Sequence, residues 1–313
     1  MWTQFDGSLP SARSNASIAY DFARGVLVLF GGIGQGPARG LLNDTWAWDG
    51  GAWTGVPESQ APSARCGASM AFDEARGVMT LFGGRGSDGA PLDDTWIWGG
   101  GWSRIDSPLS PPSRSDAGMV YDPSSEQVML FGGRGAAGTS VMAAAPVLGD
   151  TWAWNGSTWS STASAVQPQS RAFPMLAYDG VNDGIILFGG EAFGGAQLQD
   201  TWMWKDGAWT LQYPSVVPDL QPIIGGIAET QGGTIRVWGL SPTGTVGPSW
   251  GWTGATWMPD AEGVSGPQAS LAALALGYDS ESGQTILFLI PPLNAAEVSA
   301  ARKRNRTMQM WVH

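Results

Sequence analysis

The chain has few of the residues that most catalytic, metal and disulfide sites require. Its 313 residues include one cysteine and one histidine, and only 14% of them are charged. One cysteine excludes an internal disulfide framework, and a single histidine, His313, excludes the Cys–His and Ser–His pairs of nucleophilic enzymes. Zinc and copper sites need clustered His or Cys, so we predict no metal and no cofactor.

Basic residues and long apolar segments are also scarce. The 16 Lys and Arg are outnumbered by 27 Asp and Glu, which gives a net charge of −11. Binding to phosphates favours a net basic surface, so we expect no nucleic-acid partner. No apolar run approaches the ~20 residues of a membrane span, and the start of the chain shows no signal peptide. We therefore expect a cytoplasmic protein, a monomer, without a membrane partner.

What the chain does contain is glycine, tryptophan and an internal repeat. It has 46 Gly and 18 Trp. The repeat reads Leu-Phe-Gly-Gly, a variable loop, Asp-Thr-Trp-x-Trp, a glycine turn and a last Trp, and two weaker copies follow the clear ones, from Val237 and Leu287. An aromatic residue before an Asp marks a period of about fifty residues. These aromatic residues are Tyr20, Phe72, Tyr121, Tyr178 and, after a gap of two periods, Tyr278.

Each repeat predicts four short strands. In the first copy they are "SIAY", "GVLVLFGG", "DTWAW" and "AWTGV". Asp, Asn and Gly between the first and second strands, and again between the third and fourth, favour tight hairpin turns. A four-stranded sheet repeated about every fifty residues is typical of a β-propeller.

These motifs resemble the kelch-repeat family, and the resemblance covers nearly the whole chain. Gly pairs, the aromatic residue before each first turn and the Trp after each last turn carry it. We predict an all-β fold, a six-bladed kelch-type β-propeller with four antiparallel strands per blade. The segment "MWTQF" looks like a fourth strand and the chain ends on a third strand, so the N-terminal strand should complete the last blade and close the ring. The single domain, residues 1–313, would comprise blades at about 10–57, 62–106, 112–161, 168–213, 218–260, and 267–313 with 1–5.

Tryptophan and glycine in this pattern indicate architecture. A sugar-binding platform needs Trp at selected exposed places, whereas Trp in every repeat predicts packing between neighbouring sheets. The Gly pairs predict a positive φ or a close approach of neighbouring backbone. The pairs are 31–32, 83–84, 132–133 and 189–190.

The candidate ligand site is a set of arginines. The resemblance places the first strand of each blade innermost, and a repeated Pro-x-x-Arg motif puts an Arg just before that strand. Arg binds carboxylates and phosphates in a bidentate manner, so we expect a small acidic or amphipathic molecule, or a peptide segment. Alternatively, the repeated Arg residues bind loop carbonyls and repeated Asp residues and tie the blades together. The set is Arg13, Arg65, Arg85, Arg114, Arg134 and Arg171, and the alternative partners are Asp44, Asp94, Asp150 and Asp200.

Arg85 and Arg134 are the stronger functional candidates, because they follow Gly pairs and lie outside the repeated motif. Two long loops, 134–149 and 290–306, are further candidates, since long loops on a rigid scaffold often carry function. The second loop predicts a helix with Asn294 as its N-cap. In the last two repeats the Arg position becomes Gln221 and Leu271, and apolar residues such as Ile223, Ile224 and Leu274 lie nearby, so that part of the face is expected to be apolar.

Three functions compete at this point. A binding module fits the Arg-bearing face, and a structural subunit fits the regular repeat. A metal-independent enzyme of the cyclase, isomerase or lyase type is the alternative, with Asp116 as a lone general base; otherwise Asp116 is the partner of an Arg. Cys66 would be a nucleophile if the neighbouring Arg65 lowered the pKa of its thiol, and otherwise a small buried residue.

Overall fold

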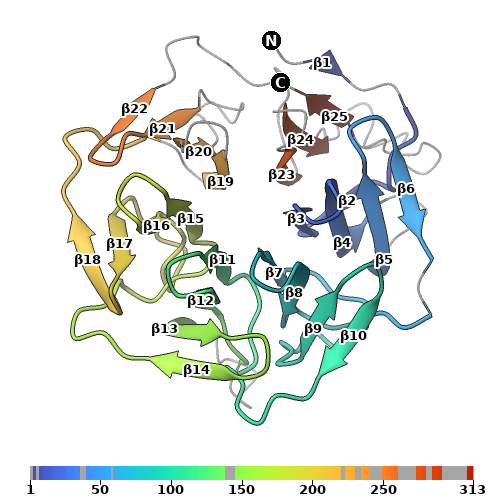
Figure 1. Cartoon of the computed structure of the whole chain (residues 1–313), viewed down its shortest axis with the longest axis horizontal. Helices are drawn as coiled ribbons and strands as arrows, with labels where there is room; N and C mark the ends of the chain where they lie inside the picture. Colours follow the sequence, from blue (N-terminus) through green and yellow to red (C-terminus); the bar gives the residue numbers. More distant parts are fainter. Residues whose placement is uncertain are drawn as a thin grey trace.

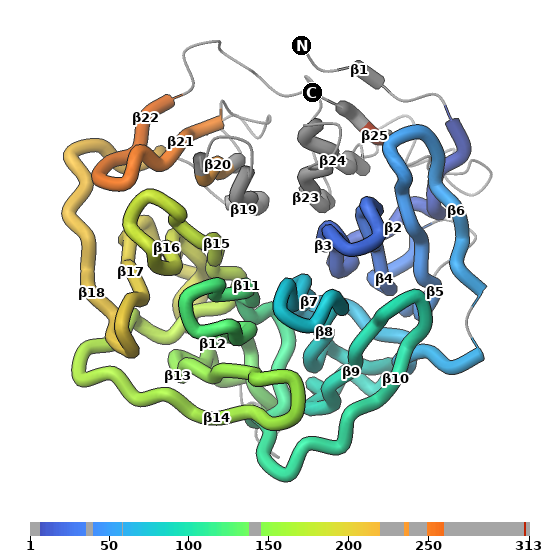
Figure 2. The backbone as a smooth tube through the Cα atoms, viewed as in Figure 1, coloured from blue at the N-terminus to red at the C-terminus, as the bar shows by residue number. Residues whose placement is uncertain are grey.

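The chain forms antiparallel sheets set around a central axis, and this arrangement is a β-propeller (Figure 1). Successive sheets follow one another around the ring in sequence order, as the tube in Figure 2 shows. Among the residues that are described, no helix is long and apolar enough to cross a membrane. The computed structural model describes residues 3–4, 7–35, 40–57, 59–137, 145–219, 223–229, 234–239, 249–259, 273–279, 284–290 and 309–312.

Several sequence predictions fall outside these ranges. The central part of loop 134–149, residues 138–144, is one of them, and residues 291–306 of the second loop, with the Asn294 helix, are another. Gln221 and Leu271 are likewise not among the described residues. The domain limits drawn from the repeat stay a prediction.

Each sheet runs from an inner strand beside the axis to an outer strand at the rim. The first sheet holds β2 (Arg13–Ser14), β3 (Ser17–Asp21), β4 (Val26–Gly34), β5 (Gly40–Trp48) and β6 (Trp53–Val56). The next two hold β7 (Ser69–Asp73), β8 (Val78–Phe82), β9 (Thr95–Trp98) and β10 (Trp102–Ile105), then β11 (Gly118–Asp122), β12 (Gln127–Arg134), β13 (Val147–Trp154) and β14 (Trp159–Thr162). Two more hold β15 (Met175–Asp179), β16 (Gly184–Phe188), β17 (Thr201–Lys205) and β18 (Ala208–Gln212), then β19 (Ile223–Glu229), β20 (Thr234–Gly239), β21 (Trp250–Trp252) and β22 (Trp257–Pro259). The last holds β23 (Ala273–Asp279), β24 (Gln284–Ile290), β25 (Gln309–Val312) and β1 (Thr3–Gln4).

The prediction of six four-stranded blades is wrong. The described strands form five four-stranded blades, and the sheet of residues 13–56 has five strands. Its extra strand, β2, pairs with the end of β4, where Arg13 lies opposite Gly34. The physical reason is the length of β4, which continues beyond the Gly pair to Gly34. In the following blade the same contact is an isolated bridge between Cys66 and Arg85.

The N-terminal strand pairs with the C-terminal one, as the sequence predicts. β1 is antiparallel to β25, with Thr3 opposite Val312 and Gln4 opposite Trp311. Figure 1 shows β1 and β25 next to each other in the last sheet. This pairing covers the edge of β25, whose backbone groups would otherwise lack a partner strand.

Tryptophans pack between neighbouring blades, which confirms their structural interpretation. The outer-strand Trp102 packs on Phe30 of the preceding blade, with ring centroids 5.0 Å apart. Its indole N–H donates to Thr45 Oγ1 of that blade at 2.9 Å. In the first blade Trp53 donates to Met310 Sδ at 3.3 Å, because Met310 stands where other repeats have Thr. The other Trp–Thr pairs are Trp159–Thr95, Trp209–Thr151 and Trp257–Thr201.

The first Gly of each pair has the predicted positive φ and close backbone contact. Gly83 has a φ of +66°, and a Cβ there would clash with the carbonyl oxygen of Arg114 in the next blade. Gly84 N donates to the same oxygen at 2.9 Å. A side chain at Gly83 would therefore push the two blades apart at this backbone contact.

Candidate functional site

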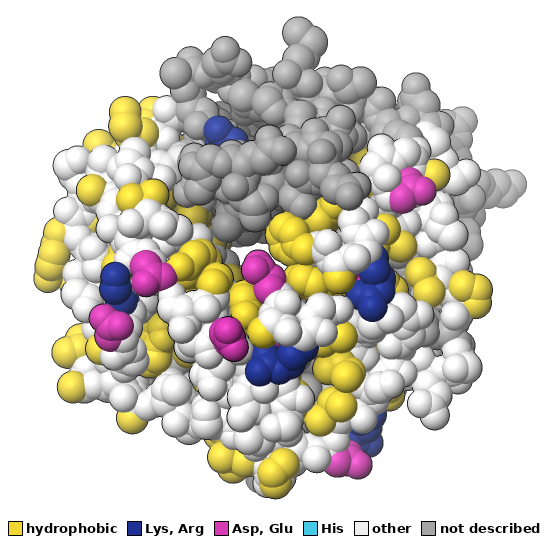
Figure 3. Space-filling model, in the orientation of Figure 1, with side chains coloured by type: hydrophobic (Ala, Val, Ile, Leu, Met, Phe, Trp, Pro, Cys, Tyr) yellow, Lys and Arg dark blue, Asp and Glu magenta, His cyan; other side chains and the backbone are white. Residues whose placement is uncertain are grey.

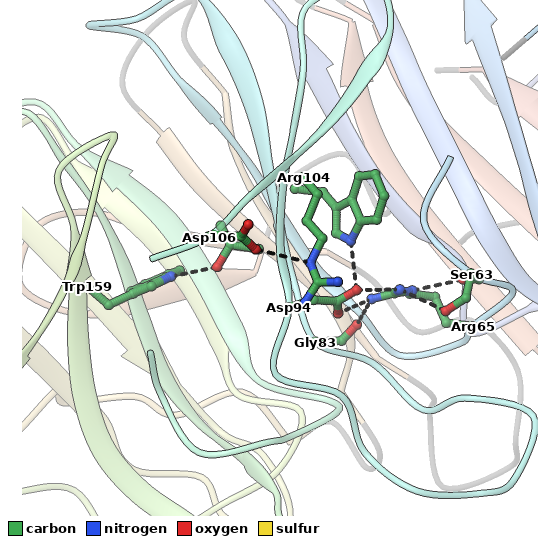
Figure 4. A network of polar contacts seen from close by, with 9 residues as sticks. Ser63, Arg65, Gly83, Asp94, Arg104, Asp106 and Trp159 are labelled. Atoms are coloured by element: carbon green, nitrogen blue, oxygen red, sulfur yellow. Dashed lines mark hydrogen bonds and ion pairs between the residues drawn. The ribbon is translucent and has the colours of Figure 1, made fainter. Parts of the chain in front are cut away.

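The repeated arginines lie inside the framework. Arg65 binds Asp94 in a bidentate manner, at 2.5 and 2.8 Å. Its other donations go to the carbonyl oxygen of Gly83, at 2.9 Å, and to the carbonyl and hydroxyl oxygens of Ser63, both at 2.9 Å (Figure 4). The side chain of Arg65 is only 1% exposed. All five guanidinium N–H groups are thus engaged.

Asp94 is the hub of this network. It also accepts the indole N–H of Trp96 at 2.7 Å. Burial raises the pKa of Asp94, but the hydrogen bonds and charge of Arg65 outweigh burial and lower the pKa overall. The same bidentate pair occurs in the other clear repeats, as Arg13–Asp44, Arg114–Asp150 and Arg171–Asp200.

These contacts match the alternative interpretation of the sequence, in which the repeated arginines bind loop carbonyls and repeated Asp residues and hold the blades together. Ligand binding by the four repeated arginines stays a prediction, and their burial and occupied donors count against it. The better candidates for ligand binding are neighbouring residues whose side chains are not part of these bidentate pairs.

A chain of backbone hydrogen bonds links four blades at the start of their inner strands. The residue two positions after each repeated Arg has a positive φ, between +52° and +62°. Gly67 N donates to Asn15 O at 2.9 Å, Asp116 N to Gly67 O at 2.8 Å, and Phe173 N to Asp116 O at 2.8 Å. The inner strands surround the central axis, so these residues lie around one end of it (Figure 1).

Asp116 lies between two arginines at this end of the axis. Its Oδ2 accepts a hydrogen bond from Ser115 Oγ at 2.9 Å. Arg85 Nη2 is 3.9 Å and Arg134 Nε is 3.8 Å from the same oxygen. Arg134 Nη2 also donates to Glu191 Oε1 at 2.6 Å. The structure thus brings together Arg85, Asp116 and Arg134, which the sequence placed on one face, and adds Glu191.

Glu191 could have been found from its position in the repeat, although not from its residue type. The positions directly after the four Gly pairs are Ile33, Arg85, Arg134 and Glu191. In three blades this position is bridged to the residue that follows the repeated Arg, as in Ser115–Arg134 and Ala172–Glu191. At this position Glu191 faces Arg134, which follows the Gly pair of the preceding blade.

The two cluster arginines differ in how far they are engaged. Arg134 is 25% exposed, is bonded to Glu191, and lies 5.3 Å over the ring of Phe173. Arg85 is 42% exposed, and its side-chain contacts are a 3.4 Å hydrogen bond to Ser115 Oγ and the 3.9 Å pair with Asp116. Among the described cluster residues, Arg85 therefore has the most weakly engaged guanidinium.

The surroundings of Cys66 count against its role as a nucleophile. Burial raises the pKa of its thiol, and the charge of Asp116 raises it further against the opposing effect of Arg85. A nucleophilic thiol needs a lowered pKa. Cys66 is buried, as the second interpretation of the sequence predicts.

The pKa of the Asp116 carboxyl is raised above its ordinary value. Burial raises the pKa, while the Ser115 hydrogen bond and the charges of Arg85 and Arg134 lower it, and Glu191 raises it; the net change is upward. Its side chain is 8% exposed. An elevated pKa brings a carboxyl closer to the range in which it can exchange a proton.

This shift predicts a pH-dependent effect of Asp116→Asn. The folded-state pKa lies above the ordinary 3.8, so the ionised carboxylate lowers the free energy of unfolding at pH 7. We expect the variant to be more stable than the wild type at pH 7, with the difference closing as the pH falls to about 3.8. The backbone accepts Asn, because Asn15 holds φ +52° at the equivalent position. Urea unfolding across this pH range checks it, and a difference independent of pH contradicts it.

The opposite end of the axis has a different character. Figure 3 views the face that carries the turns between inner and second strands, and hydrophobic and acidic side chains lie next to its centre. The basic side chains on that face lie farther out. Within the described parts of the chain, no three His, Cys, Asp or Glu residues are grouped so that they could hold a metal ion.

Comparisons with known proteins give limited information. No protein-family model matches the chain. A segment of 109 residues is 35% identical to tRNA wybutosine-synthesizing protein 4 of Emericella nidulans, and it covers 30% of this chain. The chain spans only a tenth of the length of that protein.

Proposed function

We propose that the chain is a kelch-type propeller whose function is to bind an acidic or amphipathic ligand at the Arg85–Asp116–Arg134 end of its axis. The observation that supports this most directly is Arg85, a half-exposed guanidinium with only long contacts, fixed beside a buried carboxylate. A ligand carboxylate would offer it the short bidentate contacts that its neighbours do not supply. The ligand is a small molecule or a peptide segment.

The framework around Arg85 favours binding without rearrangement. The backbone of Arg85 is held by Cys66 through hydrogen bonds of 2.8 and 3.2 Å. The adjacent Arg134 is held by Glu191. With the backbone already held, only the side chain of Arg85 loses conformational freedom on binding, and a smaller entropy loss increases affinity.

Replacing Arg85 by Ala tests the proposal. We expect native mass spectrometry with a metabolite extract to detect a carboxylate-bearing ligand on the wild type. The variant should bind it at least about tenfold more weakly, as expected for a lost charge-assisted bond. The melting temperature should hardly change, because the Arg85 side chain is 42% exposed.

Arg104→Ala is the matched control, since Arg104 is an exposed arginine on an outer strand. It should leave the ligand bound. Equal affinity of wild type and Arg85→Ala would contradict the proposal, and so would a ligand that Arg104→Ala also loses.

A metal-independent enzyme is the second candidate function, and Asp116 is the observation that favours it. The carboxyl is buried, has a raised pKa and lies beside two cations that could hold an anionic substrate. It would act as a lone general base. Asp116→Asn separates the two functions: an enzyme would lose turnover of the bound compound while still binding it, whereas a binding module shows no turnover in either form.

The likeness to tRNA wybutosine-synthesizing protein 4 does not extend the proposal to that protein's activity. The matched segment is a small part of the other chain. The net charge of −11 also disfavours a nucleic-acid partner.

A further inference from the structure

Phe173 occupies a backbone conformation that its side chain disfavours. Its φ is +53°, in the left-handed region. Residues with a Cβ lose free energy there, and for a bulky residue such a φ is an outlier. Gly67 holds the equivalent position two blades earlier with a φ of +62°, where glycine carries no such penalty. The fold therefore does not require phenylalanine at this position, and a role other than folding would account for the side chain.

The ring of Phe173 is not explained by core packing. The residue is 44% exposed, whereas the framework phenylalanines of the Gly-pair motif are fully buried. Its described partner is the guanidinium of Arg134, which lies 5.3 Å from the ring centroid. A half-exposed ring beside a cation offers apolar surface to a molecule bound next to it.

Phe173 lies close to the cation of the proposed site. Its backbone N–H donates to the carbonyl oxygen of Asp116 at 2.8 Å. The Asp116 carboxylate is in turn 3.9 Å from Arg85. Asp116 therefore contacts the backbone of Phe173 and the guanidinium of Arg85, and Arg134, which lies over the ring, is 3.8 Å from the same carboxylate. Phe193, on the loop two residues after Glu191, adds a second exposed ring, 65% exposed, on the same blade.

We infer that the site selects carboxylates that carry an aromatic or similarly flat apolar group, with the carboxylate on Arg85 and the apolar group against Phe173. The inference rests on the proposed function and names the ligand class of that site. Phe173 is a specificity-determining residue, and its backbone strain is retained because the ring contacts the ligand.

Phe173→Gly is the direct test, with acetate and 4-fluorophenylacetate as the probes in ligand-observed NMR titrations. The wild type should bind 4-fluorophenylacetate about tenfold more tightly than acetate, the scale of one aromatic contact. The variant should lose most of this preference through weaker binding of the aryl probe, with acetate affinity unchanged. Its melting temperature should not fall, because glycine accepts the positive φ.

Asn15→Gly is the matched control, since Asn15 has the same φ of +52° in the first blade. It should change neither affinity. Phe173→Asn introduces the residue that the first blade has at this position. It is the variant to test if Phe173→Gly does not fold.

The two proposals fail in different ways. If Arg85→Ala abolishes binding of both probes but the wild type binds them equally well, or Phe173→Gly keeps the aryl preference, the inference about Phe173 is overturned while the carboxylate site stands. If neither probe binds the wild type, or Arg85→Ala binds both as well as the wild type does, the proposed function itself is overturned.

Discussion

Replacing Asp94 by Ala is expected to lower the free energy of unfolding by about 3–5 kcal/mol, the cost of leaving one member of a buried ion pair without its partner. Arg65 is 1% exposed and Asp94 15% exposed, so water cannot replace the lost carboxylate. Trp96 loses the acceptor of its indole N–H in the same substitution. The effect is large because one carboxylate satisfies donors from two side chains.

Asp106→Ala supplies the control on the same blade. Arg104 and Asp106 lie 3.7 Å apart with 61% and 94% of their side chains exposed, and Figure 4 shows this pair beside the buried one. Exposed pairs contribute little to stability, so no measurable change is expected. Urea unfolding of both variants at pH 7 measures the contrast. Equal losses in the two would mean that Arg65 and Asp94 act as a surface pair.

The Asp94 effect should also depend on pH. The folded-state pKa of Asp94 lies below the ordinary 3.8, because the pairing with Arg65 outweighs the effect of burial. A lowered pKa contributes stability that is present above the unfolded value and is lost as the pH falls through the folded one. The difference between wild type and Asp94→Ala should therefore stay constant at neutral pH and shrink only below about 3.8.

The framework could be predicted from the sequence because its contacts repeat. The Arg and Gly of the Arg65–Gly83 contact recur 18 residues apart in four blades, and an Asp equivalent to Asp94 follows in each, so one interpretation of the motif applies to all of them. The extra strand β2 could not be predicted in this way. It depends on how far β4 continues past its Gly pair, and the repeated motif does not specify that length.

The candidate site was predictable only in part. Arg85, Asp116 and Arg134 were placed on one face by their positions relative to the Gly pairs and repeated arginines. Glu191 was missed because the residue type after the Gly pair changes from blade to blade. Phe173 is not predicted because phenylalanine is not a residue type that indicates a positive φ. The positive φ becomes apparent only when Phe173 is aligned with Gly67 and Asn15 of the other blades.

Gly83→Ala should destabilise the protein by roughly 2–5 kcal/mol, through two effects at one position. The left-handed backbone costs a residue with a Cβ roughly 1–2 kcal/mol. Overpacking costs typically another 1–3 kcal/mol, and here the added carbon would clash with the carbonyl oxygen of Arg114. Backbone cannot move aside as a flexible side chain does, so the two blades would have to separate.

Gly89→Ala isolates the conformational part of this cost. Gly89 has a similar φ of +78°, but a Cβ there meets nothing within 4 Å. Its loss should be limited to the roughly 1–2 kcal/mol of the left-handed conformation. The difference between the two variants in thermal or urea unfolding is therefore the contribution of the contact between blades. Equal losses would mean that the Gly pair is needed for its backbone angle alone and that the approach of Arg114 adds nothing to its selection.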